Sequence, residues 1–184
     1  MNKLSDLFNN CLTIGHFLTP LKRESTIIIQ KSNKSNYPDP TAYRPISLLN
    51  RLSKPLESIL NNQIMYWAHK MGAISEGHFG GRGGRNIEEA LILLDSWIKE
   101  NWQKGKVVAG LFLDVKSAYL VVQREKLLQI LTQKQASDYI IAIINSFPQS
   151  RHTELKLDDF KFHMKLLERG LPQGSPLSVT LYLL

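Results

Sequence analysis

Two stretches of this sequence decide how the chain folds: Leu-Phe-Leu-Asp-Val-Lys-Ser-Ala-Tyr at residues 111–119, and Gly-Leu-Pro-Gln-Gly-Ser-Pro-Leu-Ser at residues 170–178. The first places Asp114 directly after a nearly continuous apolar run at 107–113, which is typical of a strand buried on both faces. A carboxylate at the end of such a strand is expected to face a cleft, because burying it unpaired would be costly. On the residues alone, a role in capping the next turn explains Asp114 equally well.

The second stretch predicts a tight turn over 170–175, followed by a helix or a final strand over 176–184. Glycines on both sides of Pro172 allow the backbone to approach a ligand closely. An amide side chain, Gln173, lies at the centre of this turn. The two stretches therefore predict a carboxylate and a backbone turn that face a ligand.

The composition is that of a globular domain with a basic surface. The chain has 184 residues, a hydrophobic fraction of 43% and a net charge of +7, which argues against disorder and favours an anionic partner. Nucleic acid is the commonest such partner, although a basic soluble protein without one would have the same balance.

The single cysteine, Cys11, excludes an internal disulfide and a thiolate metal cluster, and the five histidines show no metal-ligand spacing. We therefore expect a reducing, intracellular compartment, nucleus or cytoplasm. No signal peptide is recognisable, and apolar runs such as 107–113 are too short to span a bilayer, so no membrane partner is expected.

Apolar spacing and turn residues outline an α+β chain. The pattern predicts helices over 3–13, 52–71, 87–103, 124–133 and 135–147, and strands over 26–30, 46–49, 107–113, 153–157 and 160–165. Polar residues at 31–40 and glycines within 72–86 predict loops. Asn86 is expected to cap the helix that follows, with Glu89 as its reciprocal partner, and Asp158-Asp159 to form a hairpin turn.

Nucleotidyl transfer needs carboxylates on adjacent strand ends to hold two Mg²⁺ ions. The segment from Asp114 to Tyr119 resembles motif A of reverse transcriptases. The resemblance implies that Asp114 is the catalytic, metal-binding carboxylate and that the Val115 carbonyl is a second metal ligand. It also implies that Ser117 and Ala118 offer backbone N–H groups to the triphosphate, and that Tyr119 excludes a ribose 2′-hydroxyl. Without this resemblance, Tyr119 would be interpreted as a core aromatic.

Residues 170–178 resemble motif B of the same family, a highly specific nonapeptide. In that family Gln173 would donate to a sugar hydroxyl or to the templating strand, and Gly174 would belong to the nucleotide site. Ala42-Tyr-Arg-Pro-Ile-Ser-Leu-Leu-Asn50 resembles the fingers motif of reverse transcriptases from non-LTR retrotransposons. The resemblance implies that Lys31 and Arg44 neutralise the triphosphate.

The segment Gly77-His-Phe-Gly-Gly-Arg-Gly-Gly-Arg-Asn86 resembles a fingers segment of the same group. It implies that Arg82 and Arg85 contact template phosphates, although flexible Gly-Arg loops are frequent in other proteins. The resemblance covers residues 18–184 and implies a right-hand polymerase fold: a fingers lobe at 1–105 and a partial palm at 106–184. LINE-type, fungal elements resemble it most.

The chain also departs from the family pattern. Leu120 follows Tyr119 where Asp or Pro is common, and no Asp or Glu follows Glu168, so the Asp-Asp hairpin of motif C is missing, as is the thumb. Asp158-Asp159 precedes motif B and cannot replace it. One carboxylate cannot hold two Mg²⁺ ions, so we expect no polymerase activity from this polypeptide alone. The missing hairpin is also expected to leave an unpaired, aggregation-prone edge beside residues 111–113.

The function predicted from the sequence is therefore part of an RNA-directed DNA polymerase, acting on an RNA template, a DNA primer and dNTPs with Mg²⁺. The alternative is a non-catalytic nucleic-acid-binding remnant of a retroelement that kept a basic surface. An intron-encoded maturase would share the palm motifs. The sequence Tyr-Arg-Pro-Ile-Ser-Leu-Leu-Asn at 43–50 favours a retrotransposon over a maturase.

Overall fold

The computed structural model describes residues 3–32, 37–157, 160–167 and 169–184. The predicted turn residues Asp158 and Asp159, together with Lys34 and Glu168, lie outside these ranges. The chain forms two compact units: unit 1 contains residues 1–73 and 117–184, and unit 2 contains residues 74–116. These units differ from the division at 105/106, which was inferred from the family's lobes and stays a prediction.

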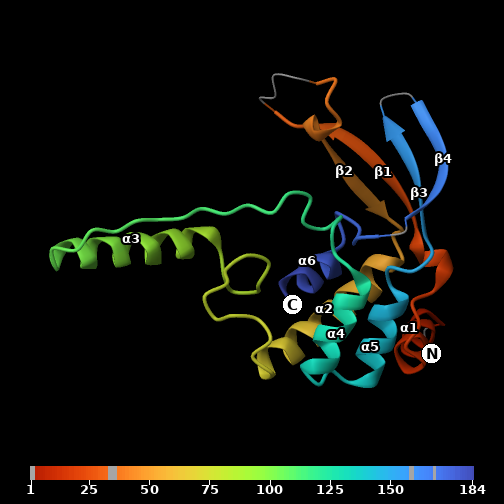
Figure 1. Cartoon of the computed structure of the whole chain (residues 1–184). Coiled ribbons are helices and arrows are strands. Elements are labelled where there is room, and N and C mark those ends of the chain that lie inside the picture. The colour runs from red at the N-terminus through yellow and green to blue at the C-terminus, as the bar shows by residue number, and fades with distance from the viewer. Residues whose placement is uncertain (1–2, 33–36, 158–159, 168) are drawn as a thin grey trace. The chain divides into compact units, whose positions relative to one another are not determined.

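Unit 1 contains a four-stranded mixed sheet (Figure 1). Its strands, in the order β2-β1-β3-β4, are β2 (Tyr43–Leu49), β1 (Arg23–Gln30), β3 (Arg151–Leu157) and β4 (Phe160–Leu167). β1 pairs antiparallel with β2 and parallel with β3, while β3 and β4 form an antiparallel hairpin. The predicted strands at 26–30, 46–49, 153–157 and 160–165 are confirmed, and each extends further than predicted.

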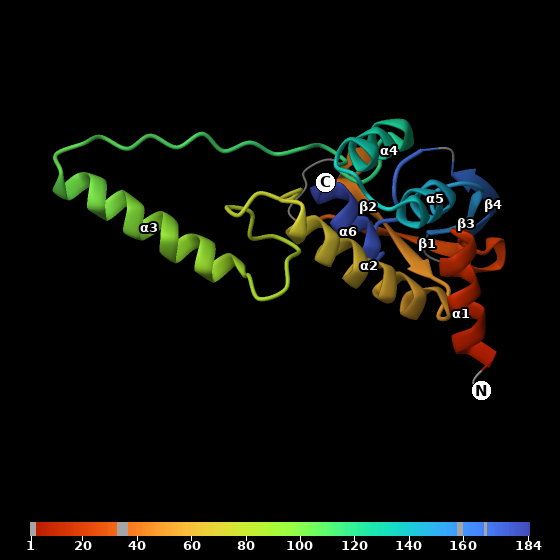
Figure 2. The same cartoon turned by 90° about the horizontal axis from the view of Figure 1, so that it is seen from below.

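The helices of unit 1 pack together at one end of this sheet (Figures 1 and 2). They are α1 (Lys3–Ile14), α2 (Ser53–Lys70), α4 (Arg124–Gln133), α5 (Asp138–Ser146) and α6 (Pro176–Leu183), with short 3₁₀ turns η1 (Thr19–Lys22) and η2 (Pro40–Ala42). The predicted helices are confirmed, and 176–184 resolves to a helix. α6 lies beside α2, and a hydrogen bond from Thr180 to Asn61 joins the two.

The core of unit 1 follows from helical spacing. Leu56, Leu60 and Ile64 recur every four residues on α2 and are fully buried, so they form one apolar stripe. They belong to one apolar cluster with residues of α1, α4, α5 and α6, in which the rings of Phe17 and Phe147 meet edge to face at 5.1 Å. Each such side chain contributes about 1.5–3 kcal/mol by burial, and Leu60→Ala would cost about 2–5 kcal/mol.

Unit 2 contains α3 (Ile87–Gln103). Half of the predicted capping box is formed: the Asn86 side chain accepts a hydrogen bond from the Glu89 backbone N–H at 2.7 Å, while the Glu89 carboxylate pairs with Arg85. No residue of α3 is buried. Its exposed large apolar side chains are Ile87, Leu91, Ile92, Leu93, Leu94, Trp97 and Trp102.

The predicted buried strand at 107–113 is wrong. The segment is extended but carries no strand pairing, and Val107 and Phe112 are 95% and 88% exposed. A strand needs a neighbour to take its backbone hydrogen bonds, and no described segment pairs with this one. The apolar residues that predicted burial are therefore on the surface of unit 2.

Cys11 lies buried in α1 as a free thiol. Burial raises the pKa of this thiol, so it is expected to stay protonated and unreactive at neutral pH. Among the described helices, none combines the length and the apolar character needed to cross a bilayer.

Candidate functional site

The motif B turn lies against the end of motif A. The Leu171 backbone N–H donates to the Tyr119 carbonyl at 2.8 Å. Gly170 has φ of +81°, and a Cβ atom there would lie 2.9 Å from the Tyr119 and Leu120 carbonyl oxygens. Only glycine fits this contact. The close packing of the turn on Tyr119 therefore explains why position 170 is a glycine.

The same turn also docks on the free edge of the sheet. β2 is an edge strand, and the Ser47 backbone N–H on it donates to the Gln173 carbonyl at 2.7 Å. Gly174, with φ of +124°, lies directly against the Ser47 carbonyl. An edge strand presents unpaired N–H and C=O groups, and the turn takes up one of them.

The turn ends at a buried cap. The Ser175 hydroxyl accepts a hydrogen bond from the Ser178 N–H at 3.2 Å, which begins α6, and donates to the Glu57 carboxylate of α2. Burial raises the pKa of Glu57, while the Ser175 hydrogen bond and the charge of Arg151 act in the opposite direction. The motif B turn is therefore held at both ends and in the middle.

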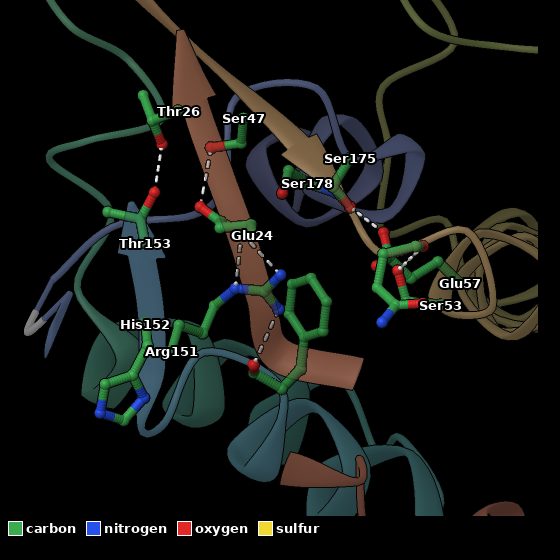
Figure 3. A network of polar contacts seen from close by, with 12 residues as sticks. Glu24, Thr26, Ser47, Ser53, Glu57, Arg151, His152, Thr153, Ser175 and Ser178 are labelled. Carbon is green, nitrogen blue, oxygen red and sulfur yellow. Dashed lines mark hydrogen bonds and ion pairs between the residues drawn. The ribbon is translucent and has the colours of Figure 1, made fainter. Parts of the chain in front are cut away.

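A buried ion pair lies behind the sheet edge (Figure 3). The Arg151 Nη2 and Nε atoms donate to Oε2 of Glu24 at 2.9 and 3.2 Å, and Ser47 Oγ donates to Oε1 at 2.8 Å. Arg151 also donates to the Phe147 carbonyl at 3.3 Å and lies over the Phe147 ring at 4.8 Å. The two charged side chains are only 1% and 0% exposed, and such a pair needs this full set of partners to offset its desolvation.

Sequence reasoning missed this pair, although a signal for it exists. Glu24-Ser-Thr26 and Arg151-His-Thr153 both place a charged residue two positions before a threonine in a predicted strand. Residues two apart share a face of a strand. In the structure β1 and β3 are neighbours, and the hydroxyls of Thr26 and Thr153 share a hydrogen bond of 2.6 Å.

Tyr119 is half-buried. Its ring packs against the core of unit 1 and lies 5.5 Å from the ring of Tyr182 on α6. Just before it, Ser117 has φ of +55°, and its carbonyl accepts from the Leu120 N–H at 2.8 Å, so residues 117–120 form a turn. Ala118 is half-buried within this turn. Unit 1 thus brings Tyr119 together with the turn that contains Gln173 and Gly174.

Of the two predicted triphosphate cations, Lys31 directly follows β1 and Arg44 lies on β2. The Lys31 ammonium donates to the Thr41 carbonyl at 2.7 Å, so its charge is directed toward the backbone of η2. Arg44 is exposed on β2 opposite Ile29. Because side chains alternate along a strand, Arg44 projects from the face opposite to that of Ser47.

Asp114 and Val115 belong to unit 2, because the boundary between the units falls between residues 116 and 117. Both residues are exposed in the extended segment. Carboxylate and carbonyl oxygens are the donors that Mg²⁺ prefers. However, the described residues contain no group of three or more His, Cys, Asp or Glu side chains that would hold a metal. The donor type fits Mg²⁺ and the number of donors does not.

The loop that precedes α3 folds around its arginines. Arg82 donates through Nη1 to the Ser75 carbonyl at 2.9 Å and to the His78 carbonyl at 3.3 Å. Arg85 pairs with Glu89 at 3.4 Å and lies over the Phe79 ring at 5.0 Å. Arg85 also lines a hollow of about 540 Å³ in unit 2. Both arginines therefore organise their own loop.

Unit 1 has a further cavity, of about 570 Å³, that the sequence did not indicate. It lies between the start of α4, the residues before β3 and the start of the motif B turn, and Arg124 and Arg169 contribute its positive charges. Arg124 pairs with Glu125 at 3.1 Å. None of the predicted site residues lines this cavity.

Comparison with known proteins places the glycine-flanked turn and the half-buried Tyr119 within a known family. Residues 29–184 match the family model described as reverse transcriptase (RNA-dependent DNA polymerase). The chain belongs to the reverse transcriptase family. Because the match runs through β2, Tyr119 and the turn, the predicted fingers motif at 42–50, motif A and motif B all fall within the family region.

Curated relatives of the chain are polymerases of mobile elements. The chain is 30% identical over 179 residues to the RNA-directed DNA polymerase from mobile element jockey of Drosophila melanogaster, covering 97% of the chain and 19% of the relative. It is 32% identical over 176 residues to the jockey polymerase of Drosophila funebris, covering 96% and 19%. The probable RNA-directed DNA polymerase from transposon BS of Drosophila melanogaster is 25% identical, with 97% and 20% covered.

The chain thus spans about a fifth of the length of these curated relatives. The predicted resemblance to reverse transcriptases of non-LTR retrotransposons is confirmed. The predicted fungal origin has no support, since these relatives come from Drosophila.

Proposed function

We propose that the chain takes part in RNA-directed DNA polymerisation, as the fingers and the first part of the palm of a right-hand polymerase. The reaction transfers a nucleotidyl group from a dNTP to a primer on an RNA template: the primer 3′-oxygen attacks the α-phosphorus, and pyrophosphate leaves. One observation carries the proposal. Three separate family motifs meet at a single turn, where Leu171 binds the Tyr119 carbonyl and Ser47 binds the Gln173 carbonyl.

The nucleotide would lie along this turn. Gly174 is exposed at the centre of this turn. Because the place of its missing Cβ atom is taken by the Ser47 carbonyl, a sugar would approach the Gly174 backbone from the remaining, exposed side. Tyr119, fixed by its packing on Tyr182, is the proposed gate against a ribose 2′-hydroxyl. Lys31 and Arg44 are the proposed partners of the triphosphate, Lys31 by exchanging its carbonyl partner for a phosphate oxygen.

The other roles fall to residues of unit 2 and of the turn at 117–120 in unit 1. Asp114, with the Val115 carbonyl, is the proposed contribution of this chain to a divalent metal site. Ser117 and Ala118 would offer backbone N–H groups to the triphosphate. Arg82 and Arg85 are the proposed contacts to template phosphates, which requires each to exchange at least one partner within its loop.

The polypeptide of residues 1–184 is expected to be inactive alone, because Asp114 by itself cannot hold two metal ions in working geometry. A primer-extension assay on an RNA template, with Mg²⁺ and labelled dNTPs, tests this. No incorporation is expected. Template-dependent incorporation that disappears in Asp114→Asn would show that the expectation is wrong and that the chain completes its own metal site.

Nucleotide binding tests the site itself. In ¹⁵N-labelled protein, addition of a dNTP is expected to shift the amide signals of residues 117–119 and 173–174, and addition of the matching NTP to shift them less. Tyr119→Val should reduce this difference, whereas Tyr66→Val, at an exposed tyrosine of α2, should not. Thermal unfolding of both variants shows whether they remain folded.

The nucleic-acid-binding alternative gives a different result in the same experiments. It predicts RNA binding that weakens with salt, is unchanged in Asp114→Ala, and occurs without any dNTP-induced shift. That combination would replace the polymerase proposal.

A further inference from the structure

We propose that the buried Glu24–Arg151 ion pair is a positioning device, which sets the place of the Gln173–Gly174 turn through Ser47. None of the predicted motifs includes Glu24 or Arg151. The positioning is a statement about unit 1 alone, and its relevance to nucleotide binding rests on the proposed function.

The first step is the geometry of the carboxylate. Two nitrogens of Arg151 converge on Oε2 of Glu24, at 2.9 and 3.2 Å, and leave Oε1 to the Ser47 hydroxyl. Arg151 is itself fixed by the Phe147 carbonyl and ring. A carboxylate held in this way has one orientation, so Oε1 is a fixed acceptor.

The second step is that Ser47 uses two groups at once. Its hydroxyl donates to the fixed Oε1 of Glu24, and its backbone N–H donates to the Gln173 carbonyl at 2.7 Å. β2 has its sheet partner, β1, on the other side, where Ser47 lies opposite Thr26. The N–H that meets the turn therefore belongs to the free edge, and the Ser47 side chain is what ties that edge to the ion pair (Figure 3).

The third step is a second anchor in the same group of charges. Glu57, fully buried on α2, accepts the hydrogen bond from Ser175 at the end of the turn. The charges of Arg151 and Glu24 both act on Glu57, in opposite directions. The charge of Arg151 thus acts on both carboxylates, on Glu24 by direct contact and on Glu57 through space, while Ser47 and Ser175 hold the two ends of the Gln173–Ser175 segment.

The test measures hydrogen exchange of the Ser47 amide in the full 184-residue chain. Ser47→Ala keeps this N–H and removes only the hydroxyl, so its exchange is expected to accelerate about tenfold, the effect of losing one hydrogen bond. Ser47→Thr, which restores a hydroxyl, is expected to restore slow exchange. Unchanged exchange in Ser47→Ala would overturn the inference.

The matched control is Thr153→Val. It removes a buried hydroxyl, the partner of Thr26 at 2.6 Å, from β3, which is separated by β1 from the strand that carries Ser47. Exchange at position 47 is expected to stay slow in this variant. An equal acceleration in Thr153→Val would mean that any loss of sheet stability loosens the turn, and would also overturn the inference.

The exchange result does not depend on nucleotide. If the wild-type chain shows no dNTP-induced shift, the proposed function fails, and the positioning is still decided by exchange at Ser47. If dNTP binds and the Ser47→Ala exchange is unchanged, the positioning inference fails and the proposed function stands. If both hold, Ser47→Ala should weaken dNTP binding more than Thr153→Val does.

Discussion

Gly174 packs so closely on Ser47 that a Cβ atom at position 174 would lie 2.6 Å from the Ser47 carbonyl oxygen. Its φ of +124° is also a conformation that residues with a side chain rarely adopt. We therefore expect Gly174→Ala to push the turn off β2 and to lower the free energy of unfolding by about 1–3 kcal/mol. Thermal unfolding measures the loss. Gly83→Ala, at a glycine whose Cβ would meet nothing within 4 Å, is the control and should be nearly neutral.

The ion pair of Glu24 and Arg151 gives a second prediction. Glu24→Ala leaves the Arg151 guanidinium as an uncompensated buried charge, so the loss in urea-induced unfolding should be about 3–5 kcal/mol. The double variant Glu24→Leu with Arg151→Met removes both charges and should recover most of this loss. A double variant as unstable as the single one would show that the charges are not what the site depends on.

Glu57 gives a prediction about acid. Burial raises its pKa above the ordinary value of 4.5, so the folded state binds more protons, and ionisation of Glu57 lowers stability as pH rises through the folded pKa. Glu57→Gln stays neutral and keeps an oxygen for Ser175. The variant should therefore melt at a higher temperature than wild type at pH 7, with the difference shrinking toward pH 4. A lower melting temperature at pH 7 would contradict this account.

Lys22 gives the corresponding prediction in alkali. Burial, with the charge of Arg151, lowers its pKa from 10.5 to about 8, so the unfolded state binds more protons between these values and stability rises with pH across that window. Lys22→Met should be more stable than wild type at pH 7, by up to about 3 kcal/mol, and lose this gain toward pH 10.5.

Replacing Lys22 leaves its hydrogen-bond partner Ser146 with another partner, so little of the gain in stability is lost. Its ammonium donates to the Ser146 hydroxyl at 3.3 Å, and this hydroxyl keeps the Phe17 N–H as a donor when Lys22 is replaced. Chemical unfolding at pH 7 and pH 10 measures the difference, with Lys126→Met at an exposed position of α4 as the control. Equal pH dependence in wild type and Lys22→Met would refute the prediction.

The exposed segment at 107–113 predicts self-association. Its Phe112 side chain is 88% exposed, in an extended stretch with unpaired backbone groups, and such edges associate with one another. Phe112→Lys should slow aggregation, followed by light scattering, without lowering the melting temperature. A buried residue at this position would instead be detected by a clear loss of stability.

Many helices and strands of both units could be predicted from the sequence because their signals are local. The β-branched run from Thr26 to Ile29 forms β1, the Leu56–Leu60–Ile64 spacing forms α2, and Asn86 caps α3 as its residue type requires. The prediction of a buried strand at 107–113 was wrong for a physical reason. Apolar residues become buried only when a partner segment packs against them.

The candidate site was predictable in its residues more than in its contacts. The motifs identified Tyr119, Gln173 and Gly174. The glycines on both sides of Pro172 predicted that the backbone of the turn comes close to another group. What that approach meets, the edge of β2 at Ser47, depends on sheet order, which the sequence did not specify. The Glu24–Arg151 pair joins residues 127 positions apart, beyond any local pattern.

That separation also has a consequence for the order of events in folding. β1 is made before its parallel neighbour β3, and the guanidinium that neutralises Glu24 comes from residue 151 at the start of β3. Until Arg151 has left the ribosome, Glu24 has no partner and stays in water, since burying it alone would be too costly. Contacts this distant in sequence make folding slow. Unit 1 therefore assembles late, and a nascent chain stalled before residue 151 carries β1 and β2 without the centre that joins them to the helices.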